Sequence, residues 1–242
     1  MNYKLSEIIN FMENWAPIQL AESWDNSGLQ IGDINSEVGN ILIGLDVDKK
    51  VLDHINQESC DLVITHHPLF FKPIKQIVEF DVGKIARAFI KKGVNLYSAH
   101  TNLDVAKDGV NDCLIKAFNL NPENGSNFIN SSGKWFKSKK GFDTADLFKY
   151  HKGHLLGAQP KTKVNTVAFG CGSGKSMLTA LLENNIELLI TGELGYHEHL
   201  FCELNNIAVY SLGHKESEVF VLAEIKERIQ KQFKNTETTI LY

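Results

Sequence analysis

The apolar and polar positions along the chain predict strands that alternate with helices. Residues 62–64 form a short apolar run (Leu-Val-Ile), the pattern of an interior strand buried on both faces. Pro68 biases His67 towards extended geometry, so no helix begins there. We therefore expect His66 and His67 at the carboxyl end of a central strand, where open α/β sheets build their sites.

The same strand, turn, helix and strand pattern occurs twice. Residues 41–67 align without a gap with residues 167–193 at a constant offset of 126. Each copy reads as a βαβ unit, which implies parallel pairing with a right-handed crossover. Residues 94–100 and 207–214 extend the similarity, with one extra residue in the second copy. We interpret the repeat as a duplication that gives an α/β fold: two related α/β halves with mixed, mostly parallel sheets covered by helices.

The expected domain boundaries follow from this repeat. Residues 1–125 form the first half, with the C-terminal segment 207–242 packing on it, and residues 164–206 form the core of the second half. Residues 126–163 connect them and hold eight lysines, with only Asp143 and Asp146 as acidic residues. This segment is either a solvated linker with a short hairpin, or a rim that attracts an anionic substrate or packs against another subunit.

Composition narrows the function classes. The chain has 242 residues and a formal net charge of −4, which argues against a general nucleic-acid-binding surface. Only the lysine-rich segment favours a nucleic-acid-binding module. Four widely spaced cysteines without a CxxC motif fit a reducing cytosol. Without a signal-peptide core or an apolar run of membrane-spanning length, we expect a cytoplasmic protein that does not enter a membrane.

Two familiar catalytic motifs are not met. The stretch FGCGSGKS, residues 169–176, resembles a P-loop, but Phe169 occupies the position where the consensus needs its first glycine. A tight strand-to-helix turn explains this stretch better. No GxSxG elbow or recognisable cysteine nucleophile is present either, so the remaining candidates are histidines and carboxylates.

Histidines and carboxylates gather at the predicted strand ends. His214 and Glu218 are four positions apart at the start of a predicted helix, which puts both side chains on one helical face. Asp104 follows a strand that we expect beside the His66–His67 strand. Successive side chains of an extended chain point to opposite sides, so His66 and His67 suit two neighbouring metals better than one. The predicted metal ligands are His66, His67, Asp104, His214 and Glu218, a nitrogen and oxygen set that suits two divalent ions of Zn, Fe or Mn.

Three further groups of residues are candidates for roles other than metal binding. His100 is interpreted as a residue that orients Asp104 or a ligand rather than binding metal itself. Glu193 and His197 are candidates for a catalytic acid or base, with a solvent-facing polar loop as the alternative. In residues 24–32, WDNSGLQIG, we expect a structural turn in which Asp25 and Asn26 cap the chain and Trp24 anchors the N-terminal helix.

These motifs together resemble a known family. WDNSGL, ITHHPLFF, SAHTNLD, ITGELGYHE and LGHKESE, in that order, are similar to the GTP cyclohydrolase 1 type 2 homologue family, the YbgI-like dinuclear metal proteins. The resemblance implies a two-domain fold of related halves, a toroidal homohexamer and a two-metal centre facing an internal cavity. It also implies the same five ligands that the spacing predicts.

The expected function is a dinuclear-metal-dependent hydrolase acting on a nucleotide or another phosphate-containing small molecule. GTP cyclohydrolase-like opening of the imidazole ring by metal-activated water is the named case. The alternative is a non-catalytic protein that binds metal for regulation, or that handles metal or a cofactor for a partner.

Overall fold

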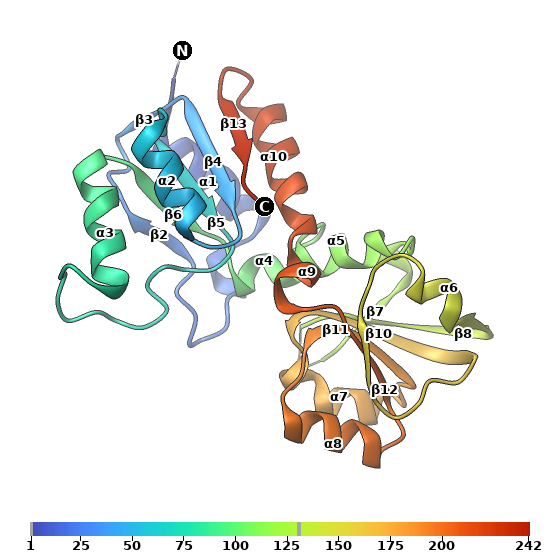
Figure 1. Cartoon of the computed structure of the whole chain (residues 1–242). Coiled ribbons are helices and arrows are strands. Elements are labelled where there is room, and N and C mark those ends of the chain that lie inside the picture. The colour runs from blue at the N-terminus through green and yellow to red at the C-terminus, as the bar shows by residue number, and fades with distance from the viewer. Residues whose placement is uncertain (1, 130–131) are drawn as a thin grey trace. The chain divides into compact units, whose positions relative to one another are not determined.

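The chain forms two compact units in a computed structural model that describes residues 2–129 and 132–242. One unit comprises the chain up to Lys107 together with Leu222–Tyr242, and the other is Asp108–Val221. Each unit holds one main β-sheet with helices packed on it (Figure 1).

The main sheet of the first unit has the strand order β13-β4-β5-β6-β2, with every neighbouring pair parallel except β2 and β6. A short antiparallel pair, β1 and β3, lies apart from it. The elements are β1 (Tyr3–Lys4), α1 (Leu5–Trp15), η1 (Ile18–Leu20), β2 (Gly28–Ile31), β3 (Glu37–Val38), β4 (Asn40–Gly44), α2 (Lys49–Gln57), β5 (Leu62–Thr65), α3 (Asp81–Lys92), β6 (Asn95–Ser98), α4 (Thr101–Val105), α10 (Phe220–Gln232) and β13 (Glu237–Ile240).

Helices α2 and α3 cover one face of this sheet. Asp48 starts α2 by accepting a hydrogen bond from the backbone N–H of Val51, and Gly93 ends α3 in the left-handed conformation that glycine adopts without strain. Burial of the apolar faces of both helices against the strands forms the core. Its buried members are Leu42, Val51, Ile55, Val63, Phe89, Val94 and Leu96.

The sheet of the second unit has the order β7-β8-β10-β11-β12-β9. Its three central strands, β10, β11 and β12, are parallel, and the outer strands pair antiparallel. The elements are α5 (Val110–Ala117), η2 (Pro122–Asn124), β7 (Ser126–Asn127), β8 (Lys134–Asp143), α6 (Thr144–Phe148), β9 (His154–Gly157), β10 (Lys163–Ser173), η3 (Gly174–Met177), α7 (Leu178–Glu183), β11 (Leu188–Glu193), α8 (Tyr196–Leu204), β12 (Ala208–Ser211) and α9 (His214–Glu218).

The two sheets share one strand register, as the sequence repeat predicts. Residues that align in the two copies occupy the same positions across their three parallel strands. The matched pairs are Gly44–Thr65 and Thr65–Ser98 in the first sheet, and Gly170–Thr191 and Thr191–Ser211 in the second. The expected fold class, two related α/β halves with mixed sheets, is confirmed, although the second sheet has more antiparallel pairs than parallel ones.

The unit boundaries differ from those expected from the sequence. β12 pairs with β11, so the chain joins the first unit again only at Leu222. The described part of residues 126–163 does not form a linker, because it supplies β7, β8 and β9 to the second sheet, while residues 130 and 131 lie outside the described part of the chain. β8 pairs with β10 over most of its length while leaving polar side chains exposed. Such an outer strand lacks the continuous apolar run that marks a buried strand.

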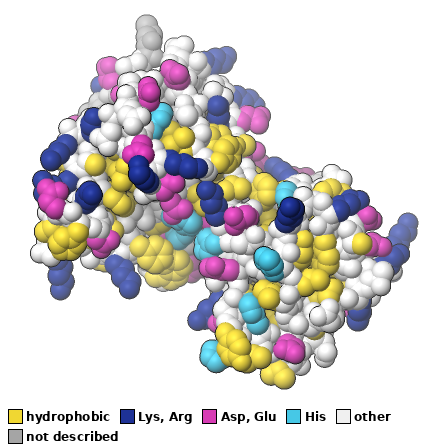
Figure 2. Space-filling view, viewed as in Figure 1, with side chains coloured by type: hydrophobic (Ala, Val, Ile, Leu, Met, Phe, Trp, Pro, Cys, Tyr) yellow, Lys and Arg dark blue, Asp and Glu magenta, His cyan; other side chains and the backbone are white. Residues whose placement is uncertain are grey.

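No helix in the described part of the chain is both long and apolar enough to cross a membrane. On the face drawn in Figure 2, lysine and arginine side chains are interspersed with acidic ones and form no continuous basic surface. This distribution agrees with the net charge of −4.

Candidate metal centre

Three histidines of the first unit meet at the carboxyl edge of its sheet. Ligand-capable atoms of His66, His67 and His100 all lie within 4.8 Å of one another. His66 directly follows β5 and His100 lies two residues beyond β6. Because β5 and β6 are parallel neighbours, their carboxyl ends meet at the same edge and bring these side chains together. We call these three residues the histidine cluster.

Asp104 joins the histidine cluster from the short helix α4. Its Oδ1 lies 3.5 Å from Nε2 of His66, whose side chain is fully buried. Two ligands of one tetrahedral zinc, each at about 2.0–2.1 Å from the metal, are about 3.3–3.4 Å apart. The observed separation is therefore close to that of two atoms sharing a metal, and longer than a normal hydrogen bond.

Each imidazole of the cluster forms a hydrogen bond to an oxygen through its Nδ1. Carbonyl and carboxylate oxygens accept hydrogen bonds, so in each case Nδ1 carries the hydrogen and Nε2 bears the lone pair. Metal-binding histidines show this arrangement, in which the second nitrogen donates to an oxygen and fixes the ring. The acceptors are the Ala99 carbonyl for His66 (2.8 Å), Asp46 Oδ1 for His67 (2.8 Å) and Asp25 Oδ1 for His100 (2.7 Å).

Asp25 is the most strongly held of these acceptors. Its side chain is fully buried, and it also accepts hydrogen bonds from the Thr101 backbone and hydroxyl and from the Ser27 hydroxyl. Burial alone would raise the pKa of Asp25, but the hydrogen bonds from His100, Thr101 and Ser27 together hold that pKa well below its usual range. Asp25 is therefore a buried carboxylate that fixes His100, and not only a cap for the local turn.

Trp24 differs from expectation as well. The sequence suggested that Trp24 anchors the N-terminal helix, but its side chain is 57% exposed. Its ring contacts those of Phe71 and His100, with centroid distances of 5.6 and 6.0 Å. Trp24 therefore lies beside the histidine cluster.

The second unit carries a separate group of predicted site residues. α9 begins at His214 and ends at Glu218, so both side chains lie on one helical face, as the spacing predicts. His214 Nε2 is 3.2 Å from Glu218 Oε1, and His214 Nδ1 is 2.9 Å from Glu193 Oε1. We call His214 and Glu218 the α9 pair, in which His214 is held through Nδ1 like the histidines of the cluster.

Glycines give the α9 pair its close approach to the end of β10. Gly172 has a φ of 55°, and a Cβ at this position would lie 2.4 Å from Glu218 Oε1 and 3.2 Å from His214 Nε2. A Cβ on Gly174 would lie 2.8 Å from Thr191 Oγ1. The glycine-rich stretch that resembles a P-loop is thus explained by close packing between the strand ends and α9.

The two acid or base candidates have different surroundings. Glu193 is more than half exposed and uses one carboxylate oxygen to hold His214. His197 is exposed in the first turn of α8, where its ring lies 5.3 Å from that of Tyr196. The arrangement gives Glu193 a direct link to the α9 pair, while the contact seen for His197 is with its neighbour.

The predicted ligands thus form two groups, one in each unit. Their donor atoms are imidazole nitrogens and carboxylate oxygens without thiolate, and every imidazole is held through Nδ1, so these residues fit a divalent metal such as Zn, Fe or Mn. Sequence reasoning did not find Asp46 and did not connect Asp25 with His100. The position of Asp46 just after β4, at the same sheet edge, was the available signal.

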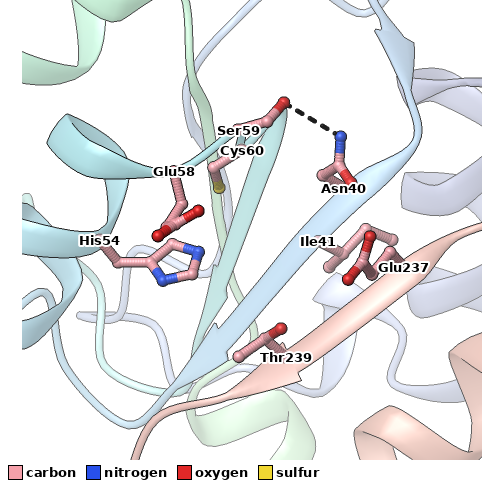
Figure 3. Close-up of a pocket in the computed structure, with 8 residues that line it drawn as sticks. All are labelled: Asn40, Ile41, His54, Glu58, Ser59, Cys60, Glu237 and Thr239. Atoms are coloured by element: carbon pink, nitrogen blue, oxygen red, sulfur yellow. Dashed lines mark hydrogen bonds between the residues drawn. The ribbon is translucent and has the colours of Figure 1, made fainter.

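A polar pocket lies away from these residues, at the amino ends of the strands in the first unit (Figure 3). Asn40 begins β4 and its side chain donates to Ser59 Oγ at 3.2 Å, and both residues line the pocket together with Glu237. Burial, and secondarily the charge of Asp61, raises the pKa of the Cys60 thiol to about 12. Cys60 therefore offers no thiolate for catalysis or metal binding at neutral pH.

The chain is similar in sequence to known proteins over most of its length. It is 32% identical over 228 residues to the GTP cyclohydrolase 1 type 2 homolog of Clostridium acetobutylicum, covering 88% of this chain and 85% of that protein. It is 33% identical over 236 residues to the GTP cyclohydrolase 1 type 2 of Helicobacter pylori, covering 91% of this chain and 90% of that protein.

A solved structure shares the whole fold. Reduced HcgD from Methanocaldococcus jannaschii superposes with a TM-score of 0.87 at 29% identity, covering 100% of this chain and 98% of that one. The family profile described as Duf34/NIF3 (NGG1p interacting factor 3) matches residues 3–241. With its two α/β units and its histidines held at the strand ends, the chain belongs to the Duf34/NIF3 family.

Proposed function

We propose that the protein is a dinuclear-metal-dependent hydrolase of a nucleotide, with GTP ring opening as the first substrate to test. One observation supports this proposal: four imidazoles, three in the histidine cluster and one in the α9 pair, each form a hydrogen bond to an oxygen through Nδ1. Relatives named GTP cyclohydrolase 1 type 2 support the choice of substrate.

The proposed metal ligands are His66, His67, Asp104, His214 and Glu218, the set expected from the sequence. His100 is held as firmly as the other imidazoles and presents Nε2 to the same cluster, so we add it as a further candidate ligand. Divalent ions held by these residues would supply the Lewis acidity that activates water for attack on a carbon of the base.

The residues of the chain itself orient the ligands and move protons. Asp25, Asp46 and Glu193 each accept the Nδ1–H of one histidine and so fix the direction of its Nε2. Glu193 is also our first choice for proton transfer, because its exposed carboxylate can exchange protons with solvent. His197 is the second choice, since it is exposed near the start of α8.

We also propose that the protein acts as a homo-oligomer in the cytoplasm, with a toroidal hexamer as the expected form. Tyr196, Leu200 and Leu204 are exposed at four-residue spacing on α8 and offer an apolar helical face for a partner subunit. The four cysteines are free thiols, as a reducing compartment requires. Light scattering in solution measures the subunit number directly.

Turnover of GTP by the metal-loaded protein tests the proposed activity. Formate release and loss of the guanine absorbance are followed for the wild type, His67→Ala and Glu218→Ala, with His154→Ala as the control because His154 is an exposed histidine on β9. We expect turnover in the wild type and control, and a loss of at least a hundredfold in the two ligand variants. Bound metal without turnover of GTP or other nucleotides would reject the hydrolase and favour a non-catalytic metal-binding role.

A further inference from the structure

An exposed aromatic pair borders the histidine cluster. Trp24 and Phe71 are 57% and 52% exposed, and their ring centroids are 5.6 Å apart with an interplanar angle of 41°. Each ring also lies 6.0 Å from the ring of His100. Exposed apolar side chains that lie in contact with one another, unlike single scattered ones, are typical of binding surfaces. We call Trp24 and Phe71 the aromatic wall.

The two segments that carry the aromatic wall are tied to each other. The Asn26 side-chain amide donates to the Phe70 carbonyl at 2.8 Å, and the Phe70 N–H donates to Gln30 Oε1 at 3.3 Å. These bonds hold the loop that follows His67 against the turn that contains Trp24. The wall is therefore positioned by the first unit itself, so a ligand meets a preformed surface rather than one it must order.

The chemistry around the wall indicates what it receives. A flat ring stacked on Trp24 or Phe71 would lie next to His100 and so beside the candidate metal ligands. Lys72 and Lys75 follow Phe71 by one and four positions on the same exposed loop, and both side chains carry a positive charge. A planar base with a phosphate group matches both features, since aromatic faces stack on any base and ammonium groups attract phosphate.

We propose that the aromatic wall of Trp24 and Phe71 is the base-recognition surface of the site, stacking on the purine of a nucleotide while its phosphate is attracted by Lys72 and Lys75. This inference rests on the proposed function for the identity of the site, and adds to it the residues that select the base. Trp24 and Phe71 contact the ligand without taking part in the chemistry.

Binding of guanosine monophosphate and ribose 5-phosphate by calorimetry tests the proposal, in metal-loaded and metal-free protein. Removing one stacked aromatic side chain weakens base binding by about fivefold to more than a hundredfold. We expect Trp24→Ala and Phe71→Ala to weaken binding of the nucleotide to this extent. Binding of ribose 5-phosphate should be unchanged. Trp24→Phe, which keeps an aromatic face, should stay within a few-fold of the wild type. Phe80→Ala, at an aromatic residue that is 66% exposed in the same unit, is the matched control.

Intrinsic fluorescence provides a second readout. The chain has three tryptophans, and stacking on Trp24 should quench a component of the emission that Trp24→Phe lacks. Because Phe71→Ala leaves the turn of Trp24 intact, it tests the wall even if Trp24→Ala fails to fold.

In the binding experiments, two results would overturn the proposal. One is equal binding of the nucleotide by wild type, Trp24→Ala and Phe71→Ala. The other is a change in subunit number in these variants with unchanged nucleotide affinity, which would assign the wall to contact with a second copy of the chain. Aromatic-dependent nucleotide binding without hydrolysis would reject the proposed activity and keep the wall. Hydrolysis with an unchanged KM in both variants would keep the proposed activity and reject the aromatic wall.

Discussion

Replacing Asp25 with asparagine tests whether this buried carboxylate holds His100. Oδ1 accepts from His100 Nδ1 and from the Asn26 N–H, and Oδ2 accepts from Thr101 and from the Ser27 hydroxyl. Whichever oxygen becomes an amide NH₂, at least two donors lose their acceptor. Each stranded donor in a buried site costs about 1–3 kcal/mol, so the loss of two acceptors should lower the free energy of unfolding of Asp25→Asn by about 2–6 kcal/mol.

The stability difference between wild type and Asp25→Asn should depend on pH in a defined direction. The pKa of Asp25 in the folded protein lies below its ordinary value of 3.8. A lowered folded pKa stabilises the protein fully above the ordinary value, and this stabilisation is lost as the pH falls from there towards the folded pKa. The stability difference between wild type and Asp25→Asn should therefore be constant near neutral pH and shrink below about pH 4.

Urea-induced unfolding of metal-free protein, followed by circular dichroism between pH 7.5 and 3.5, measures both effects. Asp33→Asn is the control, because Asp33 is an exposed carboxylate that accepts hydrogen bonds from the neighbouring Asn35. We expect a change of less than about 1 kcal/mol for the control. A change of the same small size for Asp25→Asn at neutral pH would refute the role assigned to Asp25.

Three more outcomes follow from the structure. Gly172→Ala should lower the free energy of unfolding by about 1–3 kcal/mol, because it places a Cβ against Glu218 in a left-handed backbone conformation; chemical denaturation with and without metal measures this. The pKa of Cys60 is raised to about 12 and that of Cys202 to about 11, in both cases mainly by burial, so these thiols should react with an aromatic disulfide at pH 8 only after unfolding. Chelation of bound metal should lower the thermal midpoint of unfolding. Adding back the metal at about a hundredfold above its Kd should restore about 2.7 kcal/mol of the free energy of unfolding. An unchanged midpoint would argue against metal binding by the folded protein.

Much of the fold could be predicted because its signals are local and periodic. The repeat with an offset of 126 is visible in the sequence and reappears as the common strand register. The strand that ends at His66 and the helical spacing of His214 and Glu218 were likewise readable from short stretches. Both depend on the periods of strand and helix, which a single segment reveals.

Long-range contacts could not be predicted in the same way. Asp25 meets His100 from 75 positions away, and nothing near either residue in the sequence records that contact. β8 was interpreted within a lysine-rich connecting segment because its many exposed polar residues hide its pairing with β10. The assignment of β12 to the second unit depends on its pairing with β11, which an apolar run alone does not specify.

The stoichiometry of bound metal tests the central claim most directly. Elemental analysis of protein purified without chelator, and of the same protein stripped and reloaded, is compared for wild type, His66→Ala, His214→Ala and the control His154→Ala. We predict two divalent ions per subunit in the wild type and control, with at least one lost in each ligand variant. Stoichiometric metal that survives both ligand variants, or a wild type that retains none after reloading, would contradict the metal centre proposed for this family member.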